Sequence, residues 1–142
     1  SHTYDDRVNT IKNAKAIGLN VCSGGIFGLG ETIEDRIDMA FDLKELKVNS
    51  VPINILTPIP GTPFENNEAL EPLEILKTIS IYRFIMPKTH LRYAGGRIKL
   101  GKYVKTGLKC GINSALTGNF LTTTGTTIEK DKNMITELGY KI

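Results

Sequence analysis

The sequence has no tryptophan and only two cysteines and two histidines among its 142 residues. The cysteines, Cys22 and Cys110, lie far apart, which excludes a disulfide-rich scaffold and is typical of a reducing compartment. The histidines, His2 and His90, have no metal-ligand spacing between them. We therefore interpret His90 as a hydrogen-bonded barrel residue rather than a metal ligand.

The sequence also lacks long hydrophobic runs and clustered charge. No apolar run approaches the roughly 18 residues that a membrane span needs. The opening segment SHTYDDR has neither a charged leader nor an apolar core, so it does not resemble a targeting signal. The lysines behind the net charge of +3 are scattered, whereas a nucleic-acid surface gathers them on one face. We therefore expect a cytoplasmic protein that binds neither a membrane nor nucleic acid.

Helical and strand patterns alternate along the chain. Thr32 and Asp35 form a capping-box pattern at the start of one expected helix. The expected helices cover residues 4–18, 32–47, 72–87, 102–111 and 127–142, and the expected strands cover residues 19–26, 50–59, 89–96 and 112–118. Such alternation predicts a parallel sheet with helical crossovers.

Apolar side chains alternate with polar or small ones along the expected strands. Val51 and Ile53 share one face, while Asn54 points to the other, and the same alternation places Cys22 and Arg92 on polar or small faces. A barrel around a polar interior gives this pattern. A closed barrel needs eight units and about 250 residues. With four units after a leading helix, residues 1–142 are predicted to be the C-terminal half of an α/β (β/α)8 TIM-type barrel.

The segment GGIFGLGE carries four glycines within residues 24–30. Glycines that leave the backbone bare allow a flat or phosphate-bearing ligand to lie against the main chain. A tight turn from strand to helix would need the same glycines, so both interpretations stay open. The segment is neither a dinucleotide fingerprint, which opens directly into a helix, nor a phosphate loop, because no G-K-[ST] follows.

Each candidate for chemistry on the polar face has two interpretations. Cys22 is either a small buried hydrophobic residue or a ligand facing the barrel interior. Arg92 inside a barrel needs an anionic partner, which a thiolate or a metal–sulfide cluster would provide. Asn54 either binds a ligand through its amide or fixes a loop. The threonine-rich run at residues 122–127 either binds a carboxylate or is an ordinary loop.

Several separate motifs resemble the biotin synthase family. They are VCSGGIFGLGET, SVPIN, GTP, LRYAGGR and LTT, in this order, and the resemblance runs from about Tyr4 to the end of the chain. GGIFGLGE also resembles the adenine-contacting segment of radical S-adenosylmethionine enzymes in general. The resemblance implies insertion of sulfur into dethiobiotin to form biotin, with a 4Fe-4S cluster, S-adenosylmethionine and a sulfur-donating 2Fe-2S cluster as cofactors. It also implies an electron donor such as flavodoxin and a homodimer.

The resemblance assigns roles residue by residue. Cys22 and Arg92 match ligands of the 2Fe-2S cluster. The remaining matches are Arg7, Ile26 and Leu29 as cofactor contacts, Asn54 as a contact of cofactor and substrate, and Thr122 and Thr123 as residues near the carboxylate tail of the substrate.

This chain departs from the family pattern in its cysteines. The C-x3-C-x2-C motif that binds the 4Fe-4S cluster is absent, as are two further cysteines of the 2Fe-2S cluster. We therefore expect this chain alone to be inactive. Two alternatives remain: a hydrogenase-maturation or methylornithine-type enzyme of the same superfamily, and a non-catalytic half barrel that acts only by assembling with a partner.

Overall fold

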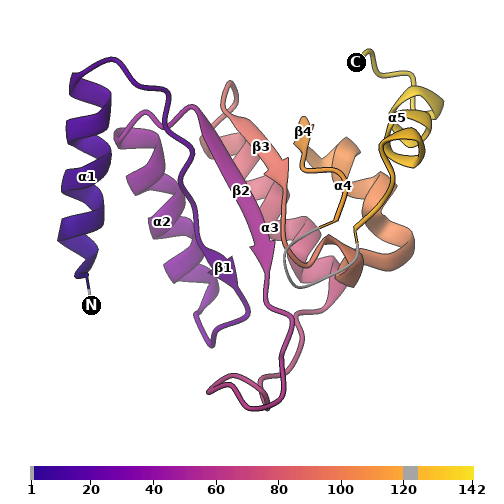
Figure 1. Ribbon diagram of the computed structural model, residues 1–142, viewed down its shortest axis with the longest axis horizontal. Helices are drawn as coiled ribbons and strands as arrows, with labels where there is room; N and C mark the ends of the chain where they lie inside the picture. Colours follow the sequence, from indigo (N-terminus) through magenta and orange to yellow (C-terminus); the bar gives the residue numbers. More distant parts are fainter. Residues whose placement is uncertain (1, 120–124) are drawn as a thin grey trace.

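In the computed structural model, which describes residues 2–119 and 125–142, helices and strands alternate as predicted. The described elements are α1 (Tyr4–Ala16), β1 (Ile26–Phe27), α2 (Ile33–Glu45), β2 (Ser50–Ile55), α3 (Pro72–Ile85), β3 (His90–Tyr93), the 3-10 helix η1 (Arg97–Tyr103), α4 (Val104–Cys110), β4 (Ser114–Ala115) and α5 (Ile128–Glu137). Within the described ranges, four parallel strands form one sheet in the order β1-β2-β3-β4 (Figure 1).

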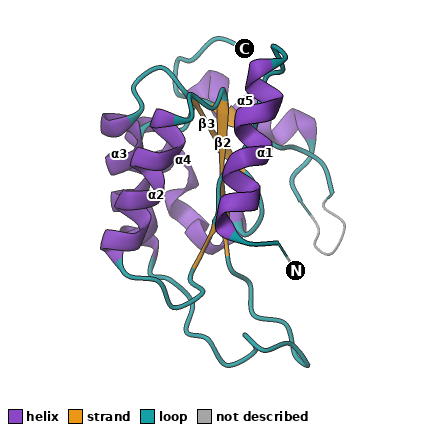
Figure 2. Cartoon of the chain, turned by 90° about the vertical axis from the view of Figure 1, so that its left-hand side faces the viewer, coloured by secondary structure: helices purple, strands orange, loops and turns teal. Residues whose placement is uncertain are grey.

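The hydrophobic core lies on one face of this sheet. Helices α2 and α3 lie on the same side of strands β2 and β3, as the side view shows (Figure 2). Val51 and Ile53 of β2 and Leu91 of β3 are buried against Ile79 of α3. The alternation in the sequence predicted that these strand residues would face the helix layer, and this prediction is confirmed.

The starts of the first two helices follow from local hydrogen bonding. At α2, the hydroxyl of Thr32 accepts a bond from the Asp35 N–H at 3.2 Å, and the Asp35 carboxylate accepts one from the Thr32 N–H at 2.8 Å. This is the predicted capping box, which satisfies two N–H groups that the helix itself leaves free. Thr3 and Asp6 make the same arrangement at α1. Two short polar patterns thus set where these helices begin.

Helix α1 is held against α2 and the strand region by side-chain hydrogen bonds. The Tyr4 hydroxyl donates to the Asp42 carboxylate, and Lys15 Nζ donates to Asn49 Oδ1 at 3.0 Å. The bond to Asp42 raises the pKa of Tyr4 to about 12. These contacts give α1 a defined position, and with it Arg7, which lies one turn after Tyr4.

The first strand is shorter than expected, and Pro52 accounts for its interruption. Cys22 forms an isolated bridge with Ser50, and the regular ladder resumes only where Ile26 pairs with Asn54. Ser50 both donates to and accepts from the segment before β1, so Pro52, two residues later, faces the same neighbour. Because proline has no N–H, one ladder bond is missing there.

Candidate functional site

Cys22 and Arg92, the two residues predicted to bind the 2Fe-2S cluster, lie on the sheet face opposite the hydrophobic core. Cys22 is bridged to Ser50, and Arg92 pairs with Pro52. Ser50 and Pro52 point to the same face because side chains two residues apart on a strand do so. Cys22 and Arg92 therefore lie on one face, one row apart, as the alternation in the sequence predicts.

Both residues line one hollow of about 670 Å³, here called the Cys22 hollow. Cys22 is exposed and Arg92 is half-buried. The lining consists of Asn20, Val21, Cys22, Lys47, Val48, Asn49, Ser50, Lys88, Thr89, His90 and Arg92. Among these described residues are three cationic side chains and no carboxylate. Such a lining favours a bound anion, because uncompensated positive charge raises the local potential.

Ser50 adds an unusual polar group to the Cys22 hollow. Ser50 is buried, and its hydroxyl has no hydrogen-bond partner within the described part of the chain. Buried hydroxyls are almost always bonded to protein or water, so an unpartnered one calls for an explanation. A bound group that accepts from this hydroxyl would supply the missing partner. The residues that line this hollow therefore suit an anionic group with acceptor atoms.

A second hollow brings together the four residues that the sequence assigned to cofactor contact. It has a volume of about 680 Å³, and its lining includes Arg7 of α1, Ile26 of β1, Leu29 and Asn54 of β2. We call it the Asn54 hollow. Ile26 and Leu29 are 49% and 39% exposed, although both are apolar. Apolar side chains exposed together in one hollow are typical of a binding site. Residues from three elements thus meet beside β1.

Glycines of the GGIFGLGE segment serve both close packing and a turn. A Cβ atom on Gly24 would lie 2.8 Å from the Pro52 carbonyl oxygen, and one on Gly25 would lie 2.9 Å from the Met39 sulfur. Gly28 and Gly30 have φ values of 100° and 106°, in the region that favours glycine. The interpretation as a tight turn is thus supported for Gly28 and Gly30. It does not compete with a ligand lying against the same backbone.

Glu31 fixes this turn, and the sequence reasoning did not single it out. Its carboxylate accepts from the N–H groups of Gly28 and Leu29, both at 2.8 Å, and from Nε of Arg36, also at 2.8 Å. Burial disfavours the charged carboxylate, but the backbone N–H bonds and Arg36 outweigh burial and lower the pKa of Glu31. The sequence did carry one indication of this role: an acidic residue directly after the last glycine of the segment, with an arginine five residues later.

Arg36 connects this turn to the helix layer. Its side chain is only 3% exposed, and its Nη1 donates to the Glu74 carboxylate of α3 at 2.8 Å. The Tyr82 hydroxyl, also from α3, donates to the Arg36 carbonyl oxygen at 2.9 Å. Burial raises the pKa of Tyr82 above its ordinary value. The turn that carries Leu29 is therefore tied to both α2 and α3.

Acid is expected to weaken this arrangement through Glu31. Because the pKa of Glu31 is lower in the folded state than its ordinary 4.5, the ionised form stabilises the fold. This stabilisation is complete well above pH 4.5 and is lost as the pH falls through the lower folded-state pKa. Urea unfolding from about pH 7 to pH 3 should show a steeper loss for the wild type than for Glu31→Gln. Parallel pH profiles would contradict this role.

Asn54 of β2 connects the segment before β1 to the loop after β3. Its Oδ1 accepts from the Gly95 N–H at 3.1 Å, and its Nδ2 donates to the Gly25 carbonyl oxygen at 3.3 Å. The alternative that Asn54 is a loop-fixing amide is therefore supported. An amide has two N–H groups and two acceptor lone pairs, so these two bonds leave capacity for a ligand in the Asn54 hollow.

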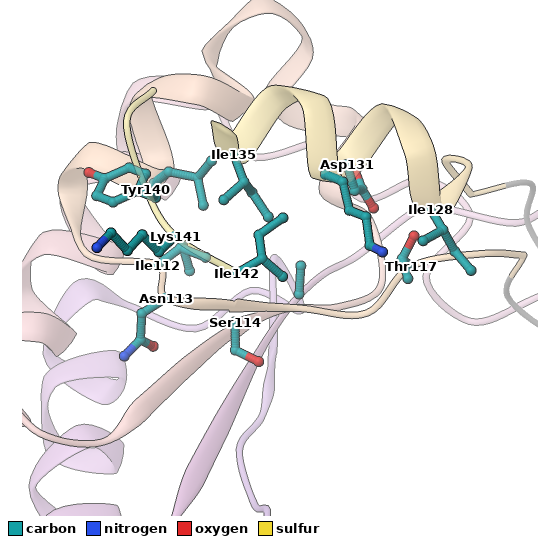
Figure 3. A pocket seen from close by; sticks show the side chains of 13 residues that line it. Ile112, Asn113, Ser114, Thr117, Ile128, Asp131, Ile135, Tyr140, Lys141 and Ile142 are labelled. Atoms are coloured by element: carbon teal, nitrogen blue, oxygen red, sulfur yellow. The ribbon is translucent and has the colours of Figure 1, made fainter. Parts of the chain in front are cut away.

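A third hollow, of about 410 Å³, lies between α5, the C-terminal residues and the region of β4 (Figure 3). Its lining includes Ile128 and Ile135 of α5 and Tyr140 and Ile142 of the C-terminus. None of the residues predicted for the site lines it. Thr122 and Thr123, predicted to lie near the substrate, fall outside the described residues.

Two features are absent from the part of the chain that the structure describes. No group of three or more histidine, cysteine, aspartate or glutamate residues there could together hold a metal ion. No helix of that part of the chain combines the length and the apolar character that a membrane crossing requires. The Cys22 hollow thus offers a single thiol from this chain.

Comparison with known protein families identifies the chain. A family model described as the Biotin and Thiamin Synthesis associated domain matches residues 52–141. The chain belongs to this family. The match includes Asn54 and Arg92, whereas Cys22 and the GGIFGLGE segment lie before it. The Biotin and Thiamin Synthesis associated domain therefore covers the second, third and fourth strands of the sheet.

Relatives of known name match the whole chain. The chain is 82% identical over 142 residues to a biotin synthase of Fusobacterium nucleatum. The match covers 100% of this chain and 39% of that protein. It is 62% identical over 140 residues to a biotin synthase of Campylobacter hominis. This match covers 99% of this chain and 43% of that protein. The chain thus spans about two fifths of the length of these relatives.

A solved structure shows the fold in a longer protein. The crystal structure of methylornithine synthase (PylB) matches with a TM-score of 0.75 and 24% sequence identity, over 99% of this chain and 46% of that one. At this identity the likeness concerns the fold alone. Together with the open sheet of parallel strands alternating with helices, it confirms the predicted half of a TIM-type barrel.

Proposed function

We propose that this chain is the C-terminal half of a biotin synthase that inserts sulfur into dethiobiotin by radical chemistry dependent on S-adenosylmethionine. The 82% identity to a protein named biotin synthase supports the family-level assignment. The observation that carries the proposal is the Cys22 hollow, where one thiol and one guanidinium meet in a lining without carboxylates. The cofactor candidates lie in the adjoining region of the same strands.

In this proposal Cys22 and Arg92 hold the 2Fe-2S cluster. The bound cluster would supply the sulfur atom that enters the substrate. Cys22 contributes a soft thiolate, the ligand type that iron–sulfur clusters use. The Arg92 guanidinium offers positive charge and several N–H donors, so its main contribution is to offset negative charge and to donate hydrogen bonds toward sulfide. The Ser50 hydroxyl is placed to donate as well.

The Asn54 hollow is proposed to bind S-adenosylmethionine. The exposed apolar side chains of Ile26 and Leu29 offer contact area for an adenine ring, and Glu31 holds Leu29 in place through its backbone N–H. Arg7 supplies positive charge for the carboxylate of the cofactor. Asn54 contacts cofactor and substrate with its remaining donor and acceptor capacity.

The remaining partners follow from the same proposal. Thr122 and Thr123 contact the carboxylate tail of dethiobiotin. The 4Fe-4S cluster, which binds S-adenosylmethionine, takes its cysteine ligands from residues outside this chain. An electron donor such as flavodoxin supplies the reducing electron, the full-length protein is a homodimer, and it works in the cytoplasm. The likeness to methylornithine synthase does not favour that activity, because it concerns the fold alone.

The proposal is tested with a full-length protein that carries this sequence after the upstream part of a relative such as the Fusobacterium nucleatum protein. With dethiobiotin, S-adenosylmethionine and a reductant under anaerobic conditions, this protein is expected to form biotin, measured by mass spectrometry. This chain alone is expected to form none, because it has only two cysteines. Biotin formation by the chain alone, or none by the full-length protein, would refute the proposal.

A further inference from the structure

The Cys22 hollow and the Asn54 hollow lie toward opposite edges of the sheet. Residues 47–49, just before β2, and residues 88–89, just before β3, line the Cys22 hollow. In the Asn54 hollow, Ile26 and Asn54 pair one residue before the ends of β1 and β2, and Leu29 lies beyond β1. All four strands run parallel (Figure 1). The Cys22 hollow therefore opens at the edge where the strands begin, and the Asn54 hollow at the edge where they end.

Two lysines stand at the edge where the strands begin. Lys47 and Lys88 are both exposed, and both line the Cys22 hollow. Neither forms an ion pair with another described residue, and no carboxylate belongs to the lining of this hollow. Their charge is thus uncompensated in the described part of the chain, and it raises the electrostatic potential at this edge. We call Lys47 and Lys88 the lysine pair.

The backbone at both lysines is held in a defined conformation. Lys47 has a φ of 51° and is the only residue other than glycine with a positive φ in the described ranges. Glycine is the usual residue where a helix ends this way, so a lysine there indicates a use for its side chain. After α3, Nη1 of Arg83 donates to the carbonyl oxygens of Pro87 and Thr89, at 3.0 and 2.9 Å. Pro87 and Thr89 flank Lys88, so both lysines extend from fixed points.

Ser50 adds a donor in the interior of the same hollow. Its side chain is 6% exposed, and its hydroxyl has no hydrogen-bond partner among the described residues. Its partner across the sheet is Cys22. The hollow thus leads from two exposed ammonium groups to a thiol and an unpaired O–H donor. A small anion that accepts hydrogen bonds would be attracted at the edge and bound inside.

The proposed function creates a need for such an anion. The 2Fe-2S cluster loses sulfur to each biotin that forms, so further turnover requires sulfide from outside. Hydrosulfide is a small anion whose lone pairs accept hydrogen bonds. When it combines with ferric iron and the Cys22 thiolate, Fe–S bonds form, the S–H bond breaks and the proton goes to water. No oxidation state changes, so this step needs no further oxidant or reductant.

We propose that the lysine pair guides hydrosulfide into the Cys22 hollow, at the edge of the sheet opposite to S-adenosylmethionine and dethiobiotin. The inference rests on the proposed function, because it requires a cluster held by Cys22 and Arg92. In a closed barrel the edges of the strands surround the openings, so the lysine pair stands at one opening and the cofactor at the other. Sulfide can then enter without passing the bound cofactor.

The test follows cluster assembly in the full-length protein after removal of its iron and sulfide. The Lys47→Met/Lys88→Met protein is mixed anaerobically with ferric iron and limiting sulfide, and the acid-labile sulfide bound to the protein is measured over time. At low salt, assembly is expected to be about tenfold slower than in the wild type, because charge steering accelerates association by about this factor or more. High salt should slow the wild type toward the variant. About tenfold more sulfide should restore the rate of the variant, since only the local concentration of the anion is lost.

The matched control is Lys44→Met/Lys77→Met. It removes the same charge from exposed positions of α2 and α3, but neither lysine lines the Cys22 hollow, so assembly should keep the wild-type rate. The inference would be overturned by equal rates in all three proteins, by a control as slow as the variant, or by a slow rate that more sulfide does not restore. The proposed function would still stand in these cases. A wild-type protein that forms no biotin would overturn the proposed function and this inference together.

Discussion

Replacing Cys22 with alanine in the full-length protein is expected to lower biotin formation more than about 100-fold, since even residues that only support a metal ligand are worth 10–100-fold. The thiol is the soft ligand that this chain contributes to the Cys22 hollow, and alanine has no donor atom to replace it. The protein should still fold, because Cys22 lies outside the hydrophobic core.

Cys110→Ala is the matched control for this prediction. Cys110 is half-buried at the end of α4 and packs against the core, so its loss should change stability slightly and leave biotin formation intact. Iron and acid-labile sulfide, measured after reconstitution, should decrease in Cys22→Ala only. A Cys22→Ala protein with wild-type iron, sulfide and activity would favour another radical enzyme of the same superfamily.

Arg92→Met is expected to have a smaller effect than Cys22→Ala, about tenfold on the rate. In the proposed function the guanidinium acts mainly through its charge and its hydrogen bonds. Lys47 and Lys88 in the same lining would still offer positive charge. Iron content should therefore stay near the wild-type level while the rate falls. A complete loss of the cluster in Arg92→Met would mean that the arginine is a full ligand.

Replacing Glu31 with alanine is expected to lower the free energy of unfolding of the full-length protein by about 2 kcal/mol. The substitution leaves the Arg36 guanidinium, which is 3% exposed, with only one of its two carboxylate partners, Glu74. It also removes the acceptor of the Gly28 and Leu29 N–H groups. Urea unfolding measures the loss. Binding of S-adenosylmethionine should weaken in parallel, because the backbone at Leu29 loses its anchor.

Glu137→Ala separates this effect from the loss of any ion pair. Glu137 and Lys105 are 62% and 53% exposed, and exposed pairs of this kind contribute less than about 1 kcal/mol. Its unfolding curve and its affinity for S-adenosylmethionine should match the wild type. Equal unfolding midpoints for Glu31→Ala and Glu137→Ala would contradict the role assigned to Glu31.

The sequence by itself was sufficient for the alternating fold and for the faces of the strands. Local patterns carry this information: Thr32 and Asp35 mark a helix start, and the period-two alternation around Val51 and Ile53 marks the face that packs on helices. Residues that pair across neighbouring strands point to the same face of the sheet, so the same alternation also placed Cys22 and Arg92 on one face. Family motifs then pointed to the residues of the Asn54 hollow.

The tertiary structure alone decided the polar contacts between distant residues. Arg36 meets Glu74 across 38 residues, and Arg97 meets Asp131 across 34 residues. Neither pairing has a signal in local periodicity, because the partners meet only when α2 packs on α3 and the start of α5 comes to lie beside Arg97 of η1. The role of Glu31 follows from its bonds to the Gly28 and Leu29 N–H groups and to Arg36. Short-range propensity thus determined the elements, whereas burial of charge, which acts only in the packed chain, determined which side chains hold the site.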